Sequence, residues 1–107
     1  MSRFYIAGAM RGHYRNNFQA FDAAAAILRA QGHEVFNPAE RDRETYGPKS
    51  EFEDVEGFDI RDALGADLEW ICKHADGIAL LPGWENSRGA KAEWATAVAL
   101  DLTLRYL

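Results

Sequence analysis

The sequence predicts an α/β domain of the flavodoxin-like or Rossmann-like kind, in which helices cover both faces of a mostly parallel sheet of four to five strands. Short apolar runs, typical of buried parallel strands, alternate with longer segments whose apolar residues recur at helical spacing. Glycine and proline, which favour turns, follow most of these segments. A chain of 107 residues, 48% of them hydrophobic, is sufficient for one domain spanning residues 1–107.

The expected order of elements is strand, helix, strand, long connection, helix, strand, helix and strand. Strands are expected at residues 4–7, 34–36, 77–81 and 102–107. Helices are expected at about residues 17–32, 59–74 and 87–100. Asn16 or Asn17 can cap the first helix and Ser87 the third, because their short polar side chains accept hydrogen bonds from free N–H groups at a helix start.

Residues 37–58 form a polar, charged connection that contains Pro38, Gly47, Pro48 and Gly57. It shows no clear periodicity, so no regular element is expected in it. A connection of this length is unusual in a small domain and commonly serves as a lid or binding loop. A disordered insertion is the alternative.

Composition excludes several classes of protein. The 17 acidic and 12 basic residues give a net charge of −5, and no basic stripe exists to bind a nucleic acid polymer. The single cysteine, Cys72, excludes an intramolecular disulfide. The histidines His13, His33 and His74 lie far apart without zinc-ligand spacing, and no metal or cofactor is expected. Without a secretory signal or a membrane-spanning run, a cytoplasmic location is expected.

Two acidic residues occupy positions that should face the sheet. At about 100° per residue, Glu93 falls among Ala90, Trp94 and Ala97 in the apolar stripe of the third helix. Asp67 lies on the flank of the apolar stripe of the second helix, which is formed by Ile60, Leu64, Leu68, Ile71 and Ala75. Burying a charge is costly unless the charge is paired or used, so both positions indicate function. The alternatives are that Glu93 reaches solvent from the margin of its stripe and that Asp67 is a surface residue.

Two acids at one sheet edge suit glycosyl chemistry. One can attack the anomeric carbon or stabilise an oxocarbenium ion, while the other orients the sugar or handles a proton. The turn at residues 8–12 offers glycines for close backbone approach and the cation Arg11, an arrangement that can hold a phosphate. Ser87 and Gly89 open the third helix, whose N-terminus favours an anion. An ordinary β-to-α turn and a simple helix cap explain the same residues without a ligand.

The order of these motifs resembles the nucleoside 2-deoxyribosyltransferase superfamily. Its nearest characterised pattern is that of the 2'-deoxynucleoside 5'-monophosphate N-glycosidases, and a branch met in bacterial and bacteriophage sequences is closer still. The resemblance covers nearly the whole chain. It rests on Tyr5-Ile-Ala-Gly8-Ala-Met10-Arg11-Gly12, Asp67-Leu-Glu-Trp-Ile, Ala75-Asp76 and Ser87-Arg-Gly89-Ala-Lys-Ala-Glu93.

The resemblance implies a role for each of these residues. Glu93 would be the nucleophile, Asp67 its partner near the sugar hydroxyls, and Tyr5 a neighbour of the catalytic carboxylate. The residues implied around the substrate and its 5'-phosphate are Gly8, Met10, Arg11, Gly12, Ser87 and Gly89. Family members assemble as homodimers or larger oligomers, and the apolar outer face of the third helix is consistent with a partner there.

The function implied is hydrolysis of the base–sugar bond of a nucleoside or deoxynucleoside 5'-monophosphate. Arg11 favours a monophosphate, because the transferase members lack the Arg-Gly pair and act on free nucleosides. Two alternatives remain at this point: deoxyribosyl transfer to a second base, and a catalytically silent sensor that binds a nucleotide-derived ligand. Ala9 departs from the family pattern, since the hydrolases carry a hydroxyl residue there, and residues 37–58 have no firm counterpart.

Overall fold

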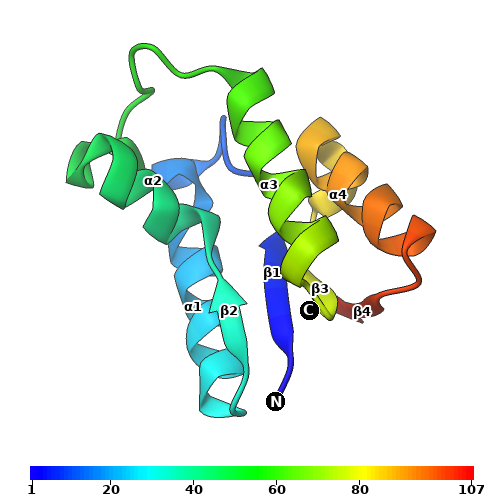
Figure 1. The fold of residues 1–107 in the computed structure, drawn as a ribbon. Coiled ribbons are helices and arrows are strands. Elements are labelled where there is room, and N and C mark those ends of the chain that lie inside the picture. Colours follow the sequence, from blue (N-terminus) through cyan, green and yellow to red (C-terminus); the bar gives the residue numbers. More distant parts are fainter.

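The computed structural model describes residues 1–107 and contains a four-stranded sheet in the order β2-β1-β3-β4 (Figure 1). Every neighbouring pair of strands is parallel. The strands are β1 (Arg3–Ala7), β2 (Glu34–Phe36), β3 (Gly77–Leu80) and β4 (Thr103–Tyr106). The helices are α1 (Phe18–Ala30), α2 (Pro38–Tyr46), α3 (Ile60–His74) and α4 (Arg88–Ala99), and the 3-10 turns are η1 (Tyr14–Asn17), η2 (Pro48–Glu51) and η3 (Trp84–Asn86). The predicted α/β fold with a parallel sheet is confirmed.

Alternate residues of β1 pack against helices on opposite faces of the sheet. Phe4 and Ile6 belong to the core that α1 covers, whereas Tyr5 and Ala7 belong to the core that α3 and α4 cover. Successive side chains of a strand point to opposite faces, so a strand buried on both faces is apolar throughout. In Figure 1, α3 and α4 lie next to each other on the side away from α1. This arrangement gives the three layers that the sequence predicts.

One of the two expected helix caps is correct, because Ser87 caps α4. The Asp59 side chain, which was not predicted as a cap, accepts hydrogen bonds at the start of α3. The expected cap of α1 is wrong. Asn16 and Asn17 have left-handed backbone angles, with φ of 51° and 61°. Their side chains instead donate to the carbonyl groups of Ser50 and Ala9, so they fasten the β1–α1 connection.

The expectation that residues 37–58 lack regular structure is also wrong, because α2 occupies part of this segment. The Asn37 side chain accepts a hydrogen bond from Ala39 N, and Pro38 supplies the first helical residue. The helix escapes detection by periodicity because ion pairs, rather than an apolar stripe, hold most of it. These include Arg43 with Asp22 and Glu40 with Arg29, the second partner of each pair lying on α1.

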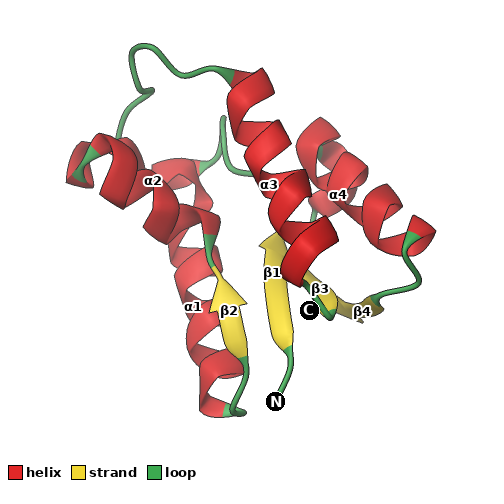
Figure 2. Ribbon diagram, in the orientation of Figure 1, coloured by secondary structure: helices red, strands yellow, loops and turns green.

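The order of the strands creates a switch point at the carboxyl edge of the sheet. From β1 the chain turns to β2 on one side and later returns to β3 on the other side. In sheets of this kind the ends of two such central strands leave a crevice between the following loops, where ligands bind. In Figure 2 the connections after β1 and between α2 and α3 both lie beyond the arrowhead of β1.

No helix has the length and apolar character needed to cross a membrane.

Candidate functional site

A cavity of about 240 Å³ lies at this switch point. That volume is slightly below the roughly 300 Å³ at which common small-molecule sites begin. Its wall combines the end of β1 and the loop after it with residues of α2, the first half of α3 and the start of α4. The ionisable and hydroxyl side chains in this wall are Tyr5, Arg11, His13, Arg41, Asp42, Asp67, Ser87 and Glu93.

Glu93 lies on the inner face of α4 and is only 5% exposed. It shares that face with the buried Ala90 and Ala97, so the prediction that it faces the core is confirmed. Burial raises the pKa of Glu93 from 4.5 to about 8; the hydrogen bond from Tyr5 opposes the rise, and the charge of Asp67 adds to it. In the unliganded protein Glu93 therefore holds a proton over most of the neutral range.

The Tyr5 hydroxyl directly contacts this acid. It donates a hydrogen bond of 2.7 Å to Glu93 Oε2. The ring of Tyr5 stacks on Phe36 with centroids 5.4 Å apart, and Trp70 lies 6.3 Å away. Burial, and then the nearby Glu93 and Asp67, raise the pKa of Tyr5 well above 10.0. The hydroxyl therefore remains a donor, held in place by the aromatic packing around it.

Asp67 projects from α3 into the same cavity and is 7% exposed. With Ile71 it forms the buried face of α3, whereas Ile60, which the pattern places in the apolar stripe, is 61% exposed. The buried face of α3 is thus rotated relative to the predicted stripe, because the first turns of α3 line the cavity rather than the core. Asp67 consequently moves from the flank of the stripe to the buried side.

Arg41 of α2 joins two of the carboxylates in the wall. Its Nη1 donates to Asp67 Oδ1 at 2.7 Å, and its Nε donates to Asp42 Oδ1 at 3.0 Å. Burial alone would lower the pKa of Arg41, but hydrogen bonds and attraction from Asp67 and Asp42 raise it. Burial raises the pKa of Asp42, and the Arg41 charge opposes that rise. Arg41 therefore stays charged, and its charge is paired with Asp67 and Asp42.

Arg11 and the start of α4 form the part of the wall best suited to an anion. The Arg11 guanidinium stacks on Phe58, with its carbon 3.6 Å from the ring centroid, and lies 3.7 Å from Asp54 Oδ1. Ser87 Oγ accepts the hydrogen bond of Ala90 N. Other N–H groups of the first turn of α4 have no intrahelical acceptor, and the helix dipole adds positive potential there. An anion can therefore be held between Arg11 and α4.

The cavity brings together most of the residues singled out from the sequence. Those in its wall are Tyr5, Gly8, Met10, Arg11, Asp67, Ser87, Gly89 and Glu93. Gly12 is not in the wall; it adopts φ of 81°, a left-handed angle that glycine tolerates in the turn. Gly8 is required for packing, because a Cβ there would lie 2.8 Å from Leu81 Cδ1.

Sequence reasoning missed Arg41, Asp42 and Phe58, all three of which line the cavity. The first two lie on α2, and the Asn37-Pro38 pair, with Glu40 in the first turn, was the available signal for that helix. Phe58 lies just before α3 in the segment that the sequence indicates as a lid or binding loop. No sequence pattern indicates that its ring packs on Arg11.

The chemistry available in the cavity follows from its charges. Glu93 can act as a nucleophile or a general acid–base group, and the Tyr5 hydroxyl can stabilise its carboxylate. Arg41 compensates the charge of Asp67, which leaves Arg11 as the guanidinium available to an anionic ligand. No group of three or more His, Cys, Asp or Glu side chains is arranged to hold a metal ion.

Comparison with known proteins places the chain in one family. No curated protein and no solved structure matches it. A family model described as "Domain of unknown function (DUF4406)" matches residues 2–106, which includes every strand and helix of the fold. The chain therefore belongs to the DUF4406 family.

Proposed function

We propose that the protein is an N-glycosidase that hydrolyses the base–sugar bond of a nucleoside or deoxynucleoside 5'-monophosphate, with Glu93 as the nucleophile. The observation that carries the proposal is the buried Glu93 carboxyl group, bound by the Tyr5 hydroxyl at 2.7 Å in a cavity that also contains Asp67. Keeping an ionisable group in such a place costs stability, and a strongly shifted pKa in a cavity is typical of a functional site.

The proposed reaction has two steps. The ionised Glu93 carboxylate attacks C1' of the sugar, the C1'–N bond breaks, and the base leaves with the bonding electrons and takes up a proton. Water then attacks C1' of the glycosyl-enzyme, which releases the sugar 5-phosphate, a proton and the free carboxylate of Glu93. The Tyr5 hydroxyl donates its hydrogen bond to the carboxylate before attack and after release. Asp67 accepts hydrogen bonds from the sugar hydroxyls.

A monophosphate is the proposed substrate because of the positive charge that Arg11 and the start of α4 place in the cavity wall. Arg11 and the first turn of α4 offer a fixed cation and free N–H groups to the 5'-phosphate. The resemblance of the Tyr5-to-Gly12 turn to that of the monophosphate N-glycosidases supports the same assignment.

A homodimer or larger oligomer is part of the proposal. The outer side of α4 is apolar and exposed at Ala95, Val98 and Ala99, followed by the exposed Leu100. A cavity of about 240 Å³ that opens to solvent is small for a nucleotide, so a neighbouring subunit would complete its wall.

The raised pKa of Glu93 favours one second candidate, a nucleotide-binding sensor without turnover. With a pKa of about 8, Glu93 is mainly protonated at neutral pH and is then a hydrogen-bond donor rather than a nucleophile. A sensor would bind its ligand with Glu93 neutral and release no base.

Base release from a panel of substrates tests the proposal. The pure protein is incubated with ribo- and deoxyribonucleoside 5'-monophosphates and with the free nucleosides, and free base is measured by chromatography. Glu93→Gln should reduce base release roughly 10³-fold or more, because an amide cannot replace the nucleophile. Ligand binding should largely survive, since the amide keeps the shape of the side chain.

Glu85→Gln is the matched control, because Glu85 is exposed on η3 beside the start of α4 and should leave base release unchanged. An active Glu93→Gln variant would refute the proposed mechanism. Tight binding of a monophosphate without base release would select the sensor. Formation of a new nucleoside when a second base is added would select deoxyribosyl transfer.

A further inference from the structure

We propose that Arg41 is a positioning residue that holds the Asp67 carboxylate in one orientation beside Glu93. The effect of this orientation on base release rests on the proposed function. The orientation of Asp67 rests on the geometry of three helices, because α2 carries Arg41, α3 carries Asp67 and α4 carries Glu93.

The hydrogen bonds around Asp67 single out Arg41. Arg41 Nη1 donates to Asp67 Oδ1 at 2.7 Å, and the carboxyl groups of Asp67 and Glu93 are themselves within hydrogen-bonding distance of each other. Arg41 is itself oriented, since its Nε binds Asp42 Oδ1 at 3.0 Å and its guanidinium carbon lies 5.7 Å from the Phe36 ring centroid. A guanidinium can bind two carboxylates in fixed directions, which an ammonium group does less well.

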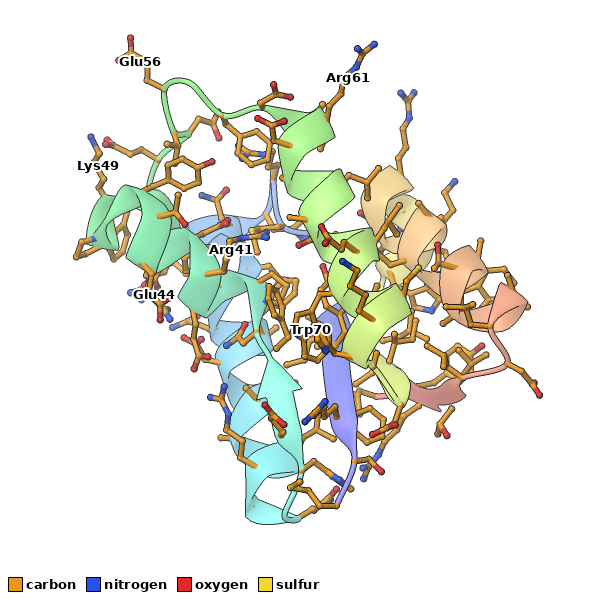
Figure 3. The ribbon with its side chains drawn as sticks, in the orientation of Figure 1. Arg41, Glu44, Lys49, Glu56, Arg61 and Trp70 are labelled. Atoms are coloured by element: carbon orange, nitrogen blue, oxygen red, sulfur yellow. The ribbon has the colours of Figure 1, made fainter.

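The helix that presents Arg41 is fastened to α1. Arg43 binds both oxygens of Asp22, at 3.1 and 2.6 Å, and Arg29 binds both oxygens of Glu40, at 2.6 and 2.7 Å. In Figure 3 Arg41 points from α2 toward α3, whereas other labelled charged residues of this region point outward. Arg41 is thus the charged residue of α2 that reaches α3, and α1 fixes its position.

Arg41 also breaks the symmetry between two neighbouring acids. The groups that face Glu93 are the Tyr5 hydroxyl from β1, Asp67 from α3 and Arg41 from α2. The remaining ionisable groups in the cavity wall are Asp42 on α2 and, after β1, Arg11 and His13. Two close carboxyl groups share one proton and resist losing it. Burial raises the pKa of Glu93, and the charge of Arg41, held against the neighbouring Asp67, opposes that rise.

The test compares Arg41→Gln and Arg41→Lys with the control Arg43→Gln. Arg43→Gln removes the ion pairs with Asp22 and Glu51 but leaves the Arg29–Glu40 pair and the Asn37 cap to hold α2, and Arg43 does not line the cavity. The titration of the Glu93 carboxyl carbon is followed by NMR, and Glu93→Gln assigns the signal. Base release is measured over the same pH range, and circular dichroism verifies that each variant is folded.

Arg41→Gln should raise the pKa of Glu93 further, by about one pH unit or more, because the opposing charge of Arg41 is lost. It should lower kcat on the order of 100-fold, because a misoriented Asp67 no longer matches the transition state. Arg41→Lys should restore most of the titration but not kcat. Arg43→Gln should change neither quantity while lowering the melting temperature.

The proposal is overturned if Glu93 titrates alike in Arg41→Gln and in the wild type. It is also overturned if Arg43→Gln shifts the titration of Glu93 as much as Arg41→Gln. A wild-type protein that releases no base from any nucleotide defeats the proposed function, whereas the NMR titration of Glu93 still decides whether Arg41 acts on the pair of acids.

Discussion

Glu93 is the residue at which stability and the proposed chemistry oppose each other. Its carboxyl group lies where a helix of this fold would otherwise bury an apolar side chain, between Ala90 and Ala97. The hydrogen bond from Tyr5 compensates only part of the cost of ionising it there, as the pKa of about 8 indicates. Such a local conflict between burial and charge is expected at functional sites, where part of the stability is given up.

The raised pKa of Glu93 predicts how stability depends on pH. The folded protein holds this proton up to about pH 8, whereas the unfolded chain releases it near the ordinary value of 4.5. The contribution of Glu93 is therefore fully present below about pH 4.5 and is lost as pH rises to about 8, by at most about 1.4 kcal/mol per pH unit. Glu93→Gln lacks this loss, so it should be more stable than the wild type at pH 8.

Denaturant unfolding of both proteins between about pH 5 and pH 9 measures the effect as a difference. The two proteins are compared because other carboxyl groups also titrate and change the stability of each protein with pH. Burial raises the pKa of Asp42, while the hydrogen bonds from Arg43 and Asn37 outweigh burial and lower that of Asp22. These groups occur in both proteins and cancel. A difference in unfolding free energy that does not change with pH would contradict the buried, protonated state of Glu93.

Arg11 is the second residue whose role can be measured singly. Arg11→Ala should weaken binding of nucleoside monophosphates roughly tenfold to 100-fold, because a charge-assisted hydrogen bond to phosphate is worth about 1.5–3 kcal/mol. Binding of the free nucleoside should change little. Arg61→Ala is the matched control, since Arg61 points away from the molecule in Figure 3. Unchanged monophosphate affinity in Arg11→Ala, measured by calorimetry, would refute the phosphate site.

At the scale of elements, α2 differs from the other helices in what holds it. The helices α1, α3 and α4 each bury side chains against the sheet or each other, whereas the buried residues of α2 are Pro38, Ala39 and Asp42. Its remaining attachment is made of a cap and ion pairs to α1. Surface ion pairs contribute little individually, so the cap should be important for the stability of this helix.

Asn37→Ala should therefore lower the free energy of unfolding by about 1–2 kcal/mol. The change removes the hydrogen bond that Asn37 accepts from Ala39 N and the one that it donates to Asp22. Asn37→Ser retains a capping oxygen and should recover part of the loss. Base release should fall in Asn37→Ala as well, since α2 presents Arg41. Equal stability of all three proteins in urea would show that the cap does not hold α2.

At the scale of the whole molecule, topology places chemistry from distant segments at one edge. The central position of β1 and β3 brings the loop after β1 close to the start of α4, which is how Tyr5 meets Glu93 across 88 positions of sequence.

A second feature at this scale is the aromatic group beside the outer edge of the sheet. Trp84 stacks on Trp94 with centroids 5.5 Å apart, and Trp94 Nε1 donates to the Tyr106 hydroxyl.

This edge and the outer side of α4 predict self-association. Val98 and Leu100 are each 46% exposed and Tyr106 is 59% exposed. We expect sedimentation equilibrium to show a dimer or larger species at micromolar concentration. Val98→Glu should shift the distribution toward monomer, because a charge in an apolar interface is costly. Glu69→Lys, which changes an exposed residue of α3, should leave the distribution unchanged. A wild-type monomer at all concentrations would contradict the expectation.

The sequence alone determined the parallel α/β fold and the inward direction of Glu93. Both depend on local periodicity: an apolar run marks a strand buried on two faces, and a spacing of about 3.6 residues per turn places Glu93 between Ala90 and Ala97. The cap of α4 followed from local chemistry in the same way. The roles drawn from family resemblance are a different matter, since they remain predictions for the experiments above.

Only the tertiary structure decided what surrounds these acids. Periodicity cannot detect α2, because side chains from another helix hold it and its own sequence lacks an apolar stripe. It placed Ile60 inside and Asp67 on the flank, whereas in the structure Ile60 is 61% exposed and Asp67 only 7%. The ion pair of Arg41 with Asp67 joins residues 26 positions apart on different helices. Charge states in a cavity depend on every group that shares it, and only the folded chain determines which groups those are.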